Sequence, residues 1–160
     1  MENIFFVKYP RMYLVEDTFI GYVYKVRDKM DLFLNLSKAL VFPNYFGENW
    51  DALCEVYRDF DWISNNDIVI IHEDLSLLDE YDLRMYLKII KITLSFWAGF
   101  NDHSVCFIFS EIDKLFSIKS KLPPIRVSSF NVPVSPFPGT ALKLSTTETV
   151  KFFSSPYSTI

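Results

Sequence analysis

The residue types that could do chemistry are few in this sequence. It contains two histidines, His72 and His103, which leaves almost no residues for a catalytic histidine pair or for a metal site built on several histidines. The Ser nucleophile elbow, the Cys-x-x-Cys pair and the His-Glu-x-x-His motif are absent from the sequence. Its four glycines are isolated from one another, which excludes the Gly-rich loops that hold nucleotide phosphates. We therefore expect no nucleotide-binding enzyme.

One cluster of polar residues could still act as an enzyme site. His72, Glu73 and Asp74 come at the end of an apolar run, Asp67–His72, that predicts a buried strand. Ligands of parallel α/β proteins bind where such strands end, so these residues could hold a metal. Three adjacent polar residues are also an ordinary start of a loop. We keep a metal-dependent enzyme as an alternative but predict no catalytic residue, no metal ligand and no cofactor.

A second polar pattern is a stripe of carboxylates. Asp51, Glu55 and Asp59 recur every four residues, which places them on one side of a predicted helix from Asn49 to about Phe60. Each like-charge pair at this spacing costs an isolated helix about 0.2 to 0.5 kcal/mol. A stripe kept despite this cost suits a surface that meets cations, and a solvated acidic face is the alternative.

The stripe lies in the most acidic part of the chain. Residues 44–82 contain eleven carboxylates and one base, Arg58, a net charge of −10 in a chain whose total is −4. Such a segment repels phosphate backbones and attracts basic proteins. We expect a basic protein partner and no nucleic acid.

The elements that position these residues alternate between strand and helix. Runs of β-branched and aromatic residues predict strands at Phe19–Lys25, Asp67–His72 and Val105–Phe109. The spacing of apolar residues predicts helices from Asp28 to before Pro43, from Asn49 to about Phe60, and from about Asp79 to Trp97. This order indicates an α/β fold with a small parallel sheet of about three strands packed by about three helices.

The loop before the acidic helix points to a family. The stretch Phe42–Glu55 reads FPNYFGENWDALCE, in which Gly47 can adopt the angles of a tight turn and Asn49 can cap the helix. It resembles the signature of the barstar-like family, intracellular ribonuclease inhibitors and immunity proteins. The residues at the family's spacing are Pro43, Tyr45, Phe46, Gly47, Asn49, Asp51, Ala52 and Leu53, with Glu55 at a second carboxylate position. The resemblance extends weakly to residues 37–40 and 105–110.

The resemblance implies that this helix and loop block the active site of a toxin, with Asp51 and Glu55 standing in for RNA phosphates. Tyr45 would be an aromatic anchor. The predicted partner-binding residues are Tyr45, Phe46, Gly47, Asn49, Asp51, Cys54, Glu55 and Asp59. Cys54 replaces a tryptophan common in the family, and the position of a third family carboxylate falls near the apolar Phe96 and Trp97. We therefore expect a toxin other than barnase.

Residues 1–110 are predicted to form one inhibitor domain, with its core at 19–110. Residues 111–160 form a Pro- and Ser-rich extension, in which alternation at 142–152 predicts a hairpin, and which we expect to pack on the domain. A flexible tail is the alternative. The helix at 79–97 carries two apolar stripes, so we expect the extension, or a second copy of the protein, to cover one of them.

The remaining features concern cellular location. Two isolated cysteines, Cys54 and Cys106, favour reduced thiols, and no apolar run reaches the length of a membrane span. We expect a cytoplasmic immunity protein that neutralises a basic toxin, most simply a ribonuclease, without contacting a membrane. It would be a monomer or weak homodimer when free. A non-inhibitory binding module is a further alternative.

Overall fold

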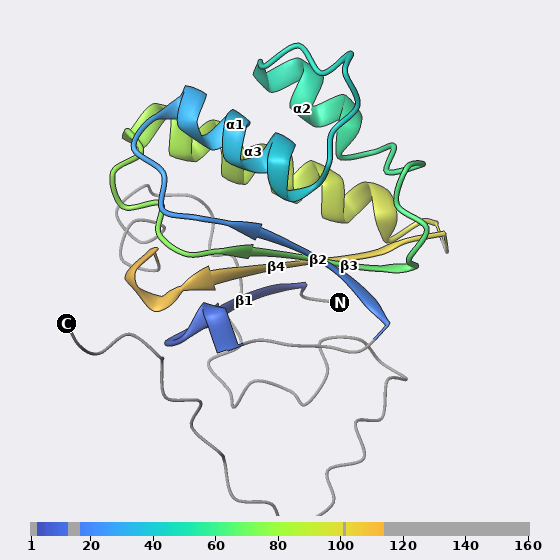
Figure 1. The fold of residues 1–160 in the computed structure, drawn as a ribbon, viewed down its shortest axis with the longest axis horizontal. Helices are drawn as coiled ribbons and strands as arrows, with labels where there is room; N and C mark the ends of the chain where they lie inside the picture. The colour runs from blue at the N-terminus through green and yellow to red at the C-terminus, as the bar shows by residue number, and fades with distance from the viewer. Residues whose placement is uncertain (1–2, 13–16, 101, 114–160) are drawn as a thin grey trace, which may run out of the picture.

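The computed structural model describes residues 3–12, 17–100 and 102–113, which form a parallel sheet with the α-helices on one face. The strands are β1 (Ile4–Val7), β2 (Thr18–Val23), β3 (Asp67–His72) and β4 (Ser104–Ser110), in the order β1-β4-β3-β2. The helices α1 (Lys29–Ala39), α2 (Trp50–Val56) and α3 (Glu80–Trp97) all lie on the same face (Figure 1). The predicted α/β fold is confirmed.

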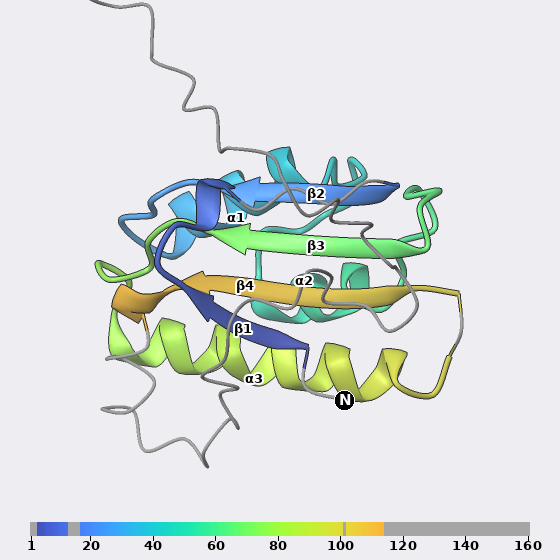
Figure 2. The same ribbon diagram turned by 90° about the horizontal axis from the view of Figure 1, so that it is seen from below.

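The strand β1 is an addition to the predicted sheet. It pairs in parallel with β4, with Ile4 opposite Phe107 and Val7 opposite Ser110 (Figure 2). Its sequence, IFFV, is apolar without alternation, and such a short run does not distinguish a strand from other buried structure. Ile4 packs in the same hydrophobic core as residues of β3 and β4. A long-range pairing therefore defines this strand.

The helix α1 begins as the sequence predicts and packs closely on β2. Asp28 is its N-cap, with Oδ1 accepting the Asp31 N–H at 2.9 Å. A Cβ atom on Gly21 of β2 would lie 2.4 Å from Cδ2 of Leu40, just past the end of α1. Gly21 thus allows the helix end to approach the strand.

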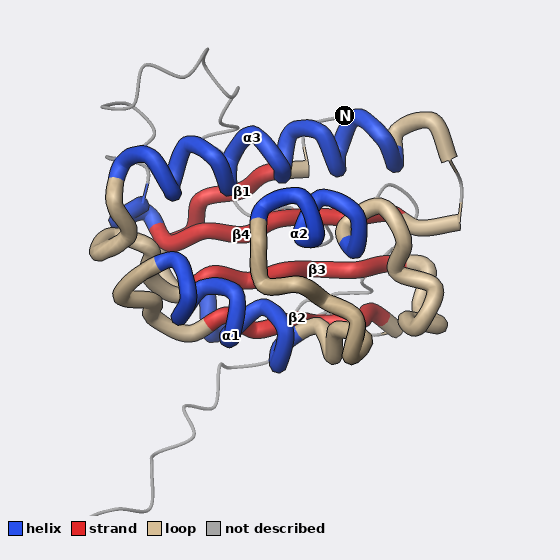
Figure 3. The backbone as a smooth tube through the Cα atoms, turned by 90° about the horizontal axis from the view of Figure 1, so that it is seen from above, coloured by secondary structure: helices blue, strands red, loops and turns tan. Residues whose placement is uncertain are grey.

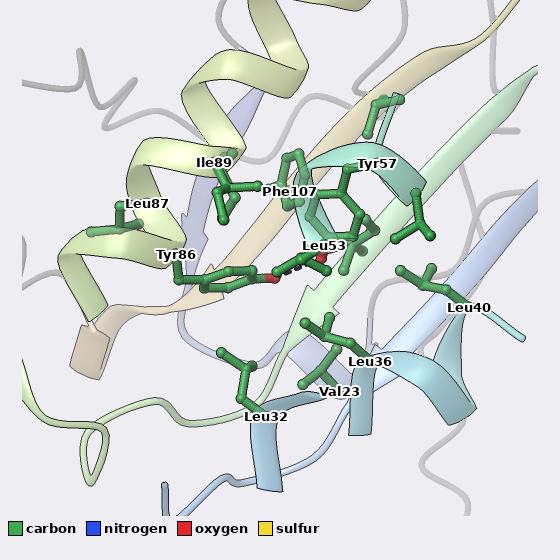
Figure 4. Close-up of a cluster of buried hydrophobic side chains, with 14 of the residues drawn as sticks. Val23, Leu32, Leu36, Leu40, Leu53, Tyr57, Tyr86, Leu87, Ile89 and Phe107 are labelled. Atoms are coloured by element: carbon green, nitrogen blue, oxygen red, sulfur yellow. Dashed lines mark hydrogen bonds between the residues drawn. The ribbon is translucent and has the colours of Figure 1, made fainter. Parts of the chain in front are cut away.

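The two apolar stripes of α3 differ in burial, and α2 packs beside the helix. Figure 3 shows α2 lying between α1 and α3 above the sheet. Trp97 of α3 donates its indole N–H to the carbonyl of Tyr57 at 2.8 Å, and the hydroxyls of Tyr57 and Tyr86 are 2.9 Å apart (Figure 4). Ile89, from the second stripe, is buried, whereas Ile92 is 38% exposed. The second stripe is therefore only partly buried among the described residues.

The predicted extension lies almost entirely beyond these elements. Glu111–Asp113 are described, whereas residues 114–160, with the predicted hairpin at 142–152, lie outside the described residues. Among the helices that are described, none is long and apolar enough to cross a membrane.

Candidate functional site

The entry to α2 is organised by the side chain of Asn49. Its Oδ1 accepts the Ala52 N–H at 2.9 Å, as predicted for an N-cap, and its Nδ2 donates to the Gly47 carbonyl at 3.0 Å. A Cβ atom on Gly47 would lie 3.0 Å from that same Nδ2. Gly47 therefore leaves room for the capping side chain.

The turn before α2 differs from the prediction at one position. Glu48, rather than Gly47, has the positive φ of this turn, at 48°. The prediction that Gly47 supplies the special backbone angles is therefore wrong; its lack of a side chain instead leaves space for Nδ2 of Asn49. Glu48 is exposed next to the cap. It is a carboxylate that the predicted site omitted, although its place beside the cap was visible in the sequence.

The helix α2 is shorter than predicted, and this changes the position of Asp59. It ends at Val56, and the Arg58 and Asp59 N–H groups bond to the carbonyls three residues earlier, at 3.0 and 3.2 Å. Such tighter turns bring Phe60, with a φ of 55°, into the core. The expected helix to Phe60 is therefore wrong, and Asp59 lies in a turn beyond the helix that carries Asp51 and Glu55.

A hydrogen bond links the loop to this turn. The hydroxyl of Tyr45 donates to Oδ2 of Asp59 at 2.9 Å, and this bond raises the pKa of Tyr45. The Tyr45 side chain remains 67% exposed. Both residues belonged to the predicted site, but their contact was not visible in the sequence, because it joins two turns fourteen residues apart. The loop before α2 is therefore tied to the segment after it.

The carboxylates of Asp51 and Glu55 remain available for a partner. Both residues are exposed, and neither side chain forms an ion pair or hydrogen bond within the described part of the chain. The nearby base, Arg58, donates from Nε to the carbonyl of Cys54 at 3.0 Å. The two charges, one turn apart on α2, thus face solvent.

Other predicted residues support the surface from beneath. Phe46 is half-buried, with its ring centre 4.8 Å from that of Phe42 and 5.9 Å from that of Phe33. Trp50 packs on Phe33 at 4.8 Å, and Cys54 is half-buried against the same core. These inward contacts hold the loop and helix in place.

His72, Glu73 and Asp74, the alternative enzyme site at the end of β3, form bonds to other groups of the protein. The three side chains separate: Glu73 pairs with Arg11, and Asp74 pairs with Lys25 at 2.8 Å, while His72 points into the core. No group of three or more His, Cys, Asp or Glu residues that could hold a metal ion occurs in the described ranges.

His72 belongs to a linear chain of hydrogen bonds that is buried in the core. Its ring stacks on Phe109 at 4.4 Å, and burial lowers the pKa of His72 to about 3, so the ring is neutral at physiological pH. Its Nδ1 lies 3.1 Å from the carbonyl oxygen of Ile108 and its Nε2 lies 2.7 Å from the Tyr86 hydroxyl. Because a carbonyl only accepts, Nδ1–H donates to Ile108 and Nε2 accepts from Tyr86. Tyr57 in turn donates to Tyr86.

A comparison with protein families assigns the chain to a family. A family model described as Barstar (barnase inhibitor) matches residues 22–109, more than half of the chain. The chain belongs to the barstar family. Proteins of the barstar family are non-enzymatic inhibitors. The matched residues run from β2 through the three helices to β4, so they include the whole of α2 and its loop. No curated protein matches this barstar-family chain.

Proposed function

We propose that this protein is an intracellular immunity protein that binds a basic toxin, a ribonuclease, and blocks its active site with α2 and the preceding loop. The proposal includes the predicted contact residues Tyr45, Phe46, Gly47, Asn49, Asp51, Cys54, Glu55 and Asp59. It adds Glu48, which is exposed in the same loop. The protein acts by occupying the site and catalyses no reaction.

The observation that carries the proposal is the pair of unused carboxylates on α2. At the end of β3, by contrast, the side chains of Glu73 and Asp74 are paired with bases of the same chain. Asp51 and Glu55 have no such partner within the described residues. They face solvent on α2, which lies within the residues matched by the barstar family. Residues one turn apart on a helix have Cβ atoms about 5 to 6 Å apart, which allows two guanidinium or ammonium groups to bind side by side.

A ribonuclease has the matching chemistry. Its active site must collect Lys, Arg and His side chains to hold a phosphate backbone, so that site attracts carboxylates presented at a suitable spacing. Each carboxylate that binds such a cation replaces the phosphate in that position. RNA and inhibitor then compete for one pocket, which accounts for inhibition without chemistry.

The loop contributes rigidity to this surface. The bonds of Asn49 to Gly47 and Ala52, together with the bond from Tyr45 to Asp59, fix both ends of the surface before a partner binds. A surface fixed in its bound form loses less conformational entropy on association. Tyr45, which remains largely exposed, offers a large aromatic contact at the same time.

The test uses the toxin that the proposal expects a neighbouring gene to encode. Its dissociation constant from the full chain is compared with that from the Asp51→Ala, Glu55→Ala double variant by isothermal titration calorimetry. A hydrogen bond to a charged group contributes about 1.5 to 3 kcal/mol, so losing two should weaken binding at least about 100-fold. Inhibition of RNA cleavage by the toxin should weaken in parallel.

A matched control removes the same charge elsewhere. Glu80→Ala, Glu111→Ala also eliminates two exposed carboxylates, but from residues outside α2 and its loop. We expect this variant to bind within about threefold of the original chain, because distant surface charges contribute little. Undiminished binding by the α2 variant, or equal losses in both variants, would refute the proposed surface.

A further inference from the structure

The sheet has a second apolar face, turned away from the helices. Its buried residues form a cluster of their own, separate from the main core, with Phe5, Ile20 and Tyr22 packed against it. The cluster consists of Val7, Val69, Ile71, Cys106 and Ile108. These residues alternate along the strands with those of the main core, as the two faces of a sheet require. We call this surface the second face.

The second face is buried, although α1, α2 and α3 all lie on the opposite side (Figure 1). Val69, Cys106 and Ile108 have exposed fractions of 0%. Within the described residues, the helix on this side is η1 (Pro10–Met12), which contacts β3 and β4. A 3-10 helix of three residues is about 6 Å long, whereas a six-residue strand is about 20 Å long. The second face therefore needs a larger cover than η1.

We propose that residues 114–160 of the same chain dock on the second face and cover it. The chain leaves β4 at Ser110, and Asp113 then accepts the Leu75 N–H on Oδ1 at 2.9 Å, which anchors the start of the extension at the carboxyl edge of the sheet. The 47 residues that follow would reach about 150 Å if fully extended, several times the width and length of the sheet. Length therefore allows the extension to cross the face repeatedly.

The composition of the extension suits an apolar surface on an acidic body. Residues 114–160 contain five phenylalanines, at positions 116, 130, 137, 152 and 153. They carry six bases and one acid, a net charge of +5, whereas residues 1–113 carry ten bases and nineteen acids, a net charge of −9. Opposite charge favours docking of the extension on its own domain. A second copy would instead bring one acidic body against another.

This inference does not depend on the proposed function, because the second face lies on the opposite side of the sheet from α2 (Figure 1). From the sequence we expected the extension, or a second copy of the protein, to cover one stripe of α3, whereas this proposal places the extension on the second face. The extension would thus complete the fold and leave the surface of α2 open.

Photo-cross-linking in the full chain tests the proposal. Phe5, on the second face, is replaced by p-benzoylphenylalanine, and the products are mapped by mass spectrometry. We expect cross-links to residues 114–160 within single chains. Cross-linked dimers, cross-links confined to residues 1–113, or no cross-links would overturn the proposal. The exposed Tyr81 of α3 is the matched aromatic control, and cross-links from it to residues 114–160 with equal yield would also overturn it.

A second position protects the test against a folding defect. Ile20, on β2, also packs against the second face and receives the same amino acid if the Phe5 variant does not fold, which circular dichroism reports. The expected and the contradicting results are the same as for Phe5.

Discussion

The surface of α2 and the carboxyl end of β3 are both rich in polar side chains, yet they differ in what those side chains contact. At the end of β3, His72, Glu73 and Asp74 each bond to another group of the protein. On α2, Asp51 and Glu55 have no partner within the described residues. Polar groups that already have partners hold the fold together, and those without partners are available to another molecule. The contacts, rather than the residue types, separate the structural cluster from the proposed binding surface.

The largest effect on stability is expected at the end of β3. Tyr86→Phe removes the hydroxyl that donates to His72 and accepts from Tyr57, leaving two buried polar groups without a partner. Such groups cost about 1 to 3 kcal/mol each, so the free energy of unfolding should fall by about 3 kcal/mol in urea denaturation. Toxin affinity of the folded variant should not change.

A neighbouring tyrosine provides the control for this substitution. Tyr81→Phe removes an exposed hydroxyl from the same helix and should leave stability within about 0.5 kcal/mol of the original chain. If Tyr86→Phe proved equally mild, the hydrogen-bond chain through His72 would not be structural.

An intermediate effect is expected from pH at the same edge of the sheet. Burial, with Asp74 nearby, raises the pKa of Asp113 to about 7, while in the unfolded chain the carboxyl ionises near pH 4. Between these values the native state binds the extra proton, so stability falls as pH rises through this window. The Asp113→Asn side chain stays neutral. Between pH 5 and pH 8, the free energy of unfolding of this variant should therefore rise by about 2 kcal/mol relative to that of the original chain.

Urea unfolding of both proteins at pH 5 and pH 8 measures this difference. Asparagine retains an oxygen that can accept the Leu75 N–H, so the comparison isolates the charge. Parallel pH profiles for the two proteins would show that Asp113 is not the titrating group.

The smallest effect on stability is expected on α2. The Asp51→Ala, Glu55→Ala variant loses exposed charges without partners in the described chain, and it also relieves repulsion between them. Its free energy of unfolding should stay within about 0.5 kcal/mol of the original chain, even though toxin binding weakens strongly. A loss of more than about 1 kcal/mol in urea denaturation would give these carboxylates a structural role and remove the contrast with β3.

Several elements could be predicted because their causes are local. Asp28 and Asn49 cap α1 and α2 through bonds to N–H groups three residues ahead, and the strands β3 and β4 are apolar runs of the expected length. The family resemblance also rested on a contiguous stretch, which the match over residues 22–109 includes. Features that depend on a few adjacent residues are visible without a structure.

Other features could not be predicted because their causes are distant in the chain. The early end of α2 depends on the burial of Tyr57 and Phe60 among residues of α3 and β4. The strand β1 exists through its pairing with β4, and the hydrogen bond between Tyr45 and Asp59 joins two turns. None of these contacts leaves a periodic pattern in the sequence.

The sequence by itself determined the order of most helices and strands, the caps of α1 and α2, the family and the acidic character of the region around α2. Only the tertiary structure decided which acidic groups form ion pairs within the protein, because a carboxylate stays available to a partner only when folding brings no base beside it. Arg11 and Lys25 reach Glu73 and Asp74 from distant parts of the chain, whereas no base of the described residues pairs with Asp51 or Glu55.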